Sequence, residues 1–119
     1  MEIAPGIHRI ETPLGDRFVC LYLLVGSEHA LLLDTGVDST PTEYLAPYLD
    51  EIGLAADKIR YVVNSHADFD HTAGNQSAKE LIAKRQSELK GLMQDSQAQV
   101  AALFELGMAI TKLQQEEQP

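Results

Sequence analysis

The sequence predicts an α/β (α+β) fold, in which a mixed sheet built on an antiparallel meander is followed by two helices. Residues 1–75 hold six of the eight glycines and four of the five prolines, which is typical of short strands separated by turns. Residues 76–119 are rich in Ala, Gln, Glu, Lys and Leu, which is typical of helix. We therefore expect a sheet-bearing half-domain at 1–75 and a helical segment at 76–119.

Length and charge limit the function. The chain has 119 residues, enough for one domain, and 18 acidic against 9 basic residues give a net charge of -9. This acidic excess argues against nucleic acid or an anionic membrane as partner, because both require a positive surface. A single cysteine, Cys20, excludes an internal disulfide and fits a reducing compartment. No basic leader or membrane-length apolar run is visible, so we expect a cytoplasmic protein.

The first strands form the expected meander. Residues 7–12 alternate apolar and polar side chains, and residues 18–25 are rich in branched and aromatic residues. The chain then turns into residues 30–33. Because residues 31–33 are all leucine, this strand is expected to be covered on both faces.

A helix is expected next, at about residues 40–53. Thr40 and Pro41 are typical of an N-cap and a first helical residue. Pro47 has no amide hydrogen to donate, so it predicts a kink or a late helix start at Ala46. Gly53 is expected to end this helix.

Residues 58–63 predict a short buried strand, and a polar loop follows it directly. The loop holds two histidines and two aspartates within six residues: His66, Asp68, Asp70 and His71. Imidazole and carboxylate are preferred ligands of divalent first-row metals, and alternate residues of an extended loop can converge on one point. Asp34, which follows the strand at 30–33, adds a third carboxylate that a cation would keep ionised. The alternative is a polar turn whose aspartates cap the next helix.

Two segments together resemble the N-terminal half of the metallo-β-lactamase superfamily. They are Leu31-Leu32-Leu33-Asp34-Thr35-Gly36 and Val62-Val63-Asn64-Ser65-His66 through Gly74-Asn75. The family signature is H-x-H-x-D-H followed by a small residue and Gly-Gly or Gly-Asn, and the resemblance covers residues 5 to about 85. It implies an αββα sandwich that hydrolyses esters, thioesters, lactams or phosphoesters with metal-activated water.

The resemblance also implies roles for individual residues. His66 and Asp68 would hold one metal ion, and Asp70 and His71 would hold a second. Asp70 would also be catalytic, by orienting the attacking water, and Asp34 would be an acid behind the metal ligands. Zinc is the expected ion.

The sequence departs from the family pattern in two ways. Asp68 stands where the signature has its second histidine, which could shift metal preference toward manganese or iron. Family members also have a second half that supplies further ligands, whereas no histidine follows His71 and Asp95 is the one aspartate after it. We therefore expect a truncated site that binds metal weakly.

The second half carries a heptad pattern from Ile82. Seven of the ten core positions at 82–113 are apolar, with a polar gap at 94–97. This gap predicts two helices, at about 76–93 and 96–115. They would either cover the sheet or mediate association between copies through residues 82–113.

Three functions remain open from the sequence. The first is a metal-binding domain of hydrolase ancestry, weakly active or inactive, with a small-molecule substrate if it is active. The second is a non-catalytic interaction protein that associates through its helices. The third is a hydrolase completed by a partner chain.

Overall fold

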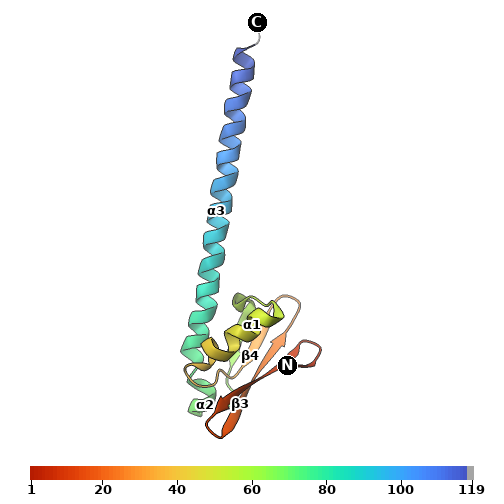
Figure 1. Ribbon diagram of the computed structural model, residues 1–119, viewed down its shortest axis with the longest axis vertical. Helices are drawn as coiled ribbons and strands as arrows, with labels where there is room; N and C mark the ends of the chain where they lie inside the picture. The colour runs from red at the N-terminus through yellow and green to blue at the C-terminus, as the bar shows by residue number, and fades with distance from the viewer. Residues whose placement is uncertain (118–119) are drawn as a thin grey trace. The chain divides into compact units, whose positions relative to one another are not determined.

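The computed structural model describes residues 1–117 and separates them into two units, residues 1–86 and a second unit that begins at Ser87. In the first unit, five strands form one sheet in the order β1-β2-β3-β4-β5 (Figure 1). The strands are β1 (Glu2–Ala4), β2 (Ile7–Leu14), β3 (Arg17–Val25), β4 (Ala30–Leu33) and β5 (Ile59–Val63). Pairing is antiparallel from β1 to β4, and β5 is parallel to β4, so the predicted mixed sheet with its meander is confirmed.

The core lies between one face of the sheet and the helix that crosses it. Alternate residues of β3 are buried, with Leu21 and Leu23 fully enclosed, as the two-residue period of a strand requires. Leu32 of β4 is also fully enclosed. Leu45, from the π-helical turn η1 (Pro41–Leu45), and Leu49, from the helix α1 (Ala46–Ile52) that follows it, pack on this cluster. Figure 1 shows α1 in yellow, lying across the sheet.

The helix after β4 starts and ends as its sequence predicts. The α-helix begins at Ala46, one residue before Pro47, and Gly53 ends it in the left-handed conformation at φ 69°. Thr40 does not act as the expected side-chain cap. Its hydroxyl instead accepts a hydrogen bond from the Val37 amide at 3.0 Å, inside the preceding loop.

The expectation that residues 58–63 are buried is wrong for most of the strand. Ile59 is buried, but Tyr61, Val62 and Val63 of β5 are exposed. The reason is topological: within residues 1–117, β5 is the last strand of the sheet and pairs only with β4. A run of β-branched and aromatic residues thus predicts the strand correctly but does not show whether it lies inside the sheet or at its edge.

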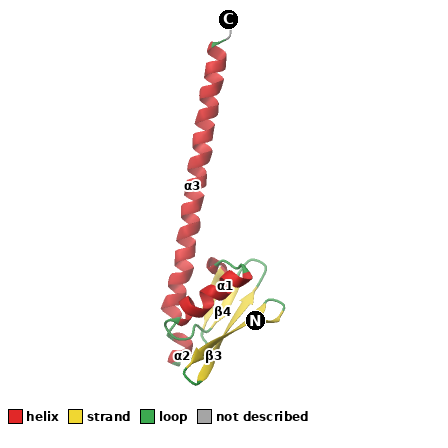
Figure 2. Cartoon of the chain, in the orientation of Figure 1, coloured by secondary structure: helices red, strands yellow, loops and turns green. Residues whose placement is uncertain are grey.

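The helical segment is also simpler than expected. After the 3-10 turn η2 (Ala56–Lys58) and the short α2 (Phe69–Thr72), one helix, α3 (Asn75–Glu116), runs through the polar residues at 94–97 (Figure 2). The predicted break there is wrong because Gln, Asp and Ser are tolerated inside a helix, and neither glycine nor proline is present in this gap. In the first unit, Ala78, Leu81 and Ile82 of α3 pack on the core.

A buried histidine joins the sheet to α1 away from the candidate metal loop. His8 of β2 lies 2.6 Å from the Tyr48 hydroxyl through Nδ1 and 3.4 Å from the Glu2 carboxylate through Nε2. Burial, followed by the negative charges of Glu51 and Glu2, raises the pKa of the Tyr48 hydroxyl. His8 therefore has a structural role here. Within residues 1–117, no helix combines the length and the apolar character needed to cross a membrane.

Candidate metal centre

Asp34 holds together the loops that follow β4 and β5. It is buried and stands directly after β4 with φ 65°, a left-handed conformation that aspartate tolerates better than most residues. The Ser65 amide donates to its Oδ1 at 2.7 Å, and the Ser65 hydroxyl donates to its Oδ2 at 2.7 Å. His71 Nδ1 lies 2.8 Å from the same Oδ2. One carboxylate thus fixes two segments that lie 31 and 37 residues further along the chain.

These hydrogen bonds determine the charge state of Asp34. Burial by itself would raise the pKa of this carboxyl group, because the charged form loses hydration. The hydrogen bonds from the Ser65 amide and hydroxyl, then the bond and charge of His71, outweigh burial and hold the pKa below its ordinary value. Asp34 is therefore an ionised acceptor at neutral pH.

The bond to Asp34 fixes the proton position on His71. A carboxylate only accepts hydrogen bonds, so His71 Nδ1 carries the proton and a neutral ring has its lone pair on Nε2. This Nε2 lies 3.8 Å from Asp70 Oδ2. A carboxylate behind an imidazole is the usual arrangement for a histidine that binds a metal.

Two more predicted site residues lie on the outer side of the loop. The His66 ring contacts the His71 ring, with 3.9 Å between centroids and an interplanar angle of 51°. The Asp68 carboxylate is 3.4 Å from His66 Nδ1, but it is 78% exposed, against 22% for the His71 side chain. The structure therefore brings Asp34, Asp70, His66 and His71 into one neighbourhood and leaves Asp68 at its solvent-facing edge.

The donor set fits a divalent cation in part. His71 Nε2 and the Asp70 carboxylate are one nitrogen and one oxygen donor at a separation compatible with a shared ion, since adjacent ligands of tetrahedral zinc are about 3.4 Å apart. Among the residues that the structure describes, however, no three His, Cys, Asp or Glu side chains are grouped closely enough to hold a metal ion. His66 and Asp68 would have to move to add ligands.

An amide pair behind the loop was missed by sequence reasoning. Asn64 and Asn75 exchange side-chain hydrogen bonds of 3.0 Å and 2.8 Å, and the Thr35 hydroxyl donates to Asn75 Oδ1 at 2.7 Å. The His71 carbonyl accepts from the Thr35 amide at 3.1 Å and from Asn64 Nδ2 at 3.1 Å. This network fixes the backbone of His71 from behind, while Asp34 fixes its ring. The available signal was Asn64 directly after β5 and Thr35 two residues after β4.

Gly74 allows the loop to lie against the segment after β4. A Cβ atom at this position would stand 2.2 Å from the Thr35 carbonyl oxygen and 2.8 Å from that of Val37. Any side chain there would push the start of α3 away from the Thr35 segment. The requirement for glycine at position 74 is therefore steric.

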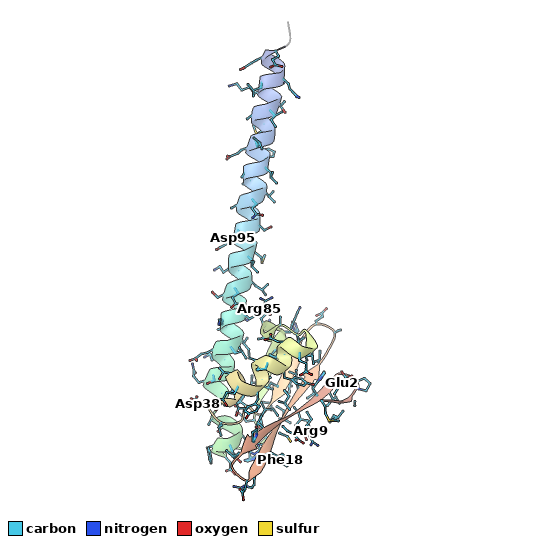
Figure 3. All side chains as sticks on the ribbon, viewed as in Figure 1. Glu2, Arg9, Phe18, Asp38, Arg85 and Asp95 are labelled. Carbon is cyan, nitrogen blue, oxygen red and sulfur yellow. The ribbon has the colours of Figure 1, made fainter. Side chains whose placement is uncertain are left out.

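A cavity of about 350 Å³ opens beside Asp70 and His71. Its polar wall consists of these two residues with Asp34 and Ser65. The other wall comes from the β2–β3 hairpin and β4: Leu14, Arg17, Phe18, Val19, Cys20, Tyr22 and Leu33. Figure 3 labels Phe18, which is largely exposed on this hairpin. The candidate metal donors thus face a space that could admit a small molecule.

Solved structures with the same fold extend well beyond this chain. A Cronobacter sakazakii metallo-β-lactamase with a HARLDQ motif is 25% identical, with a TM-score of 0.61, over 70% of this chain and 31% of its own. A metallo-β-lactamase family protein from Thermus thermophilus is 25% identical, with a TM-score of 0.57, over 67% and 28%. The class B3 di-zinc metallo-β-lactamase LRA-12 from an Alaskan soil metagenome is 14% identical, with a TM-score of 0.58, over 69% and 29%.

The chain thus spans about three tenths of the length of these structures. No curated protein matches it. The sequence profile described as the metallo-beta-lactamase superfamily matches residues 14–86, more than half of the chain. This stretch contains β3, β4, α1, β5 and the whole of the His66–His71 loop. The chain therefore belongs to the metallo-β-lactamase superfamily.

Proposed function

We propose that this protein is a metal-binding domain of hydrolase ancestry that takes up one divalent ion weakly and has little or no hydrolytic activity as a single chain. The observation that carries the proposal is the Asp34–His71 hydrogen bond of 2.8 Å, which leaves His71 Nε2 as a lone-pair donor near Asp70. His71 and Asp70 would hold the ion, and His66 and Asp68 would complete the set by rotation of their exposed side chains.

Zinc is the first ion to test. Imidazole nitrogen with carboxylate oxygen suits zinc, although the oxygen donor at Asp68 also suits manganese or iron. Among structures that share the fold, LRA-12 is a di-zinc enzyme. A bound zinc ion would supply Lewis-acid and water-activating chemistry. In that setting Asp34 would keep the His71 ring oriented, and Asp70 would accept a hydrogen bond from a water molecule in the cavity.

The aspartate at position 68 does not set the chain apart from its family. Residues 66–71 read H-A-D-F-D-H, which shares its first, second and fifth letters with the HARLDQ motif of the Cronobacter protein. Neither motif has histidine in third place. The third position therefore varies within the superfamily, and Asp68 is compatible with membership.

Weak binding follows from the geometry of the described residues. Two donors, His71 Nε2 and Asp70, face each other, whereas structural and catalytic zinc sites use three or four protein ligands. A poorly filled coordination sphere lowers affinity and leaves less control over water in the cavity. We therefore expect no hydrolysis of ester, lactam or phosphodiester substrates above the buffer rate by this chain alone.

Zinc titration by calorimetry tests the proposal. The wild-type chain is expected to bind one equivalent, and the His66→Ala, His71→Ala double variant is expected to lose at least 10-fold in affinity, because both imidazoles are removed. His29→Ala is the matched control, since this exposed histidine lies in a turn before β4 and outside the loop. Equal zinc uptake by the double variant and the control would refute the assignment of the metal site to this loop.

A second candidate function is association without catalysis. It is favoured by the apolar side chains that α3 exposes in residues 92–113, which a purely catalytic domain does not require. The same calorimetry separates the two candidates, because an interaction protein would show no specific zinc uptake.

A further inference from the structure

The second unit exposes an unusual amount of apolar surface for a single helix. Every described residue from Leu92 onward is exposed. Nine large apolar side chains in this stretch are between 49% and 69% exposed: Leu92, Met93, Val100, Leu103, Phe104, Leu106, Met108, Ile110 and Leu113. Most of the stability of a helix in a protein comes from packing of its apolar face, so a helix that exposes this much apolar surface is expected to have a partner.

Part of this surface follows a strict heptad. Leu103, Leu106, Ile110 and Leu113 repeat at spacings of three, four and three residues. Leu89 and Leu92 occupy the equivalent positions two heptads earlier. Because α3 is one unbroken helix from Asn75 to Glu116, these residues stay on one face, as in the seam of a coiled coil.

The residues beside the seam favour a second copy as the partner. On one side they are Met93, Val100, Gly107 and Gln114, and on the other Glu88, Asp95, Ala102 and Ala109. In two parallel helices each residue of the second group faces one of the first group on the partner. The acidic residues therefore meet Met or Val, and no like-charged pair forms despite the net charge of -9.

The polar residues Ser96 and Gln99 determine register and direction. In a parallel, in-register pair each meets its own copy, and the side-chain amides of two Gln99 residues can hydrogen-bond within the seam. An antiparallel pair that aligned Ser96 with Gln99 would place Ile110 and Leu113 opposite Arg85 and Ile82. Ile82 already packs on the core of the first unit, and Arg85 lies 4.0 Å from the Asp57 carboxylate there.

We propose that residues 89–113 form a parallel, in-register, two-stranded coiled coil with a second copy of the chain. Leu89, Leu92, Leu103, Leu106, Ile110 and Leu113 form its apolar seam, and Ser96 and Gln99 its polar layer. The association does not depend on metal binding in the first unit.

Sedimentation equilibrium of the full chain at about 50 μM tests the association. The expected mass is twice the 13.1 kDa of one chain. Leu106→Asp, in the seam, is expected to weaken the dimer at least 100-fold, because it buries a charge in each helix. Met108→Asp is the matched control: Met108 is 60% exposed against 58% for Leu106, but it points away from the seam. A monomeric wild type, or equal effects of both variants, would overturn the proposal.

Disulfide trapping tests direction and register. In a Cys20→Ser background, Leu103→Cys, which leaves Ser96 and Gln99 in place, is expected to cross-link fully into a dimer under mild oxidation, because parallel in-register helices bring the two copies of this seam position together. Met108→Cys is expected to remain uncross-linked under the same conditions. Cross-linking that is stronger at 108 than at 103 would refute the parallel, in-register seam.

Discussion

Replacing Asp34 with asparagine should separate the role of this residue in metal binding from its role in folding. Asparagine fits the same space and also tolerates the left-handed backbone at φ 65°. Three charge-assisted hydrogen bonds, two from Ser65 and one involving His71, become neutral ones. At about 1 kcal/mol lost per bond, the free energy of unfolding should fall by about 3 kcal/mol. A domain of ordinary stability, about 5–15 kcal/mol, would still fold.

The same variant should reverse the proton position on His71. The asparagine NH2 group donates where the carboxylate accepted, so His71 Nδ1 becomes the acceptor and its proton moves to Nε2. The lone pair that faced Asp70 is then lost, and zinc affinity should fall about 10- to 100-fold. Urea denaturation in the presence of a chelator measures the loss of unfolding free energy. Calorimetry measures the loss of zinc affinity, and ¹⁵N chemical shifts of the His71 ring report its tautomer.

The control for this variant is Asp38→Asn. Asp38, labelled in Figure 3, lies in the same loop after β4 but is exposed. It accepts one hydrogen bond, from the Ser77 hydroxyl at 3.1 Å. The Asp38→Asn substitution removes one negative charge without changing a contact of His71, so stability and zinc affinity should change little. Unchanged zinc affinity in Asp34→Asn, or an equal loss in both variants, would refute the argument that Asp34 sets the state of His71.

Two further predictions concern stability. Gly74→Ala should destabilise the chain by about 1–3 kcal/mol, because the added Cβ would overlap the Thr35 carbonyl oxygen. Gly91→Ala in α3 is the control: its Cβ would meet no atom within 4 Å, so this variant should raise helix content. Urea titration with circular dichroism measures both, and a neutral Gly74→Ala would contradict the close approach. The raised pKa of Tyr48 stabilises the fold below the unfolded value of about 10, and this contribution is lost as pH rises above it. The stability of wild type should therefore fall more steeply above about pH 10 than that of Tyr48→Phe, and parallel curves would refute this.

Local features of the fold were predictable from sequence, and features that depend on neighbours were not. The helix start at Ala46 and its end at Gly53 follow from the backbone restrictions of proline and glycine. The exposure of β5 could not be predicted, because apolar composition does not reveal whether a strand has a partner on its outer side. The unbroken α3 was missed because a polar gap between two helices and a polar stretch inside one helix look alike in a single sequence.

The candidate site shows the same division. The sequence placed His66, Asp70 and His71 in one loop, which requires only proximity along the chain. Thr35, Asn64 and Asn75 were missed because their contacts join three segments of the fold, up to 40 residues apart. A supporting network of this kind becomes visible only when the strand ends are brought together in three dimensions.

The exposed edge of β5 has a consequence for handling the protein in solution. Tyr61, Val62 and Val63 are exposed on a strand that contains one charged residue, Arg60, and no proline. Little therefore prevents this edge from pairing with a strand of another chain. Near neutral pH, the net charge of -9 opposes pairing of copies through this edge. As pH falls toward the isoelectric point of about 4.7, where carboxyl groups begin to take up protons, this repulsion disappears. Acidification to this pH should then favour edge-to-edge association between copies.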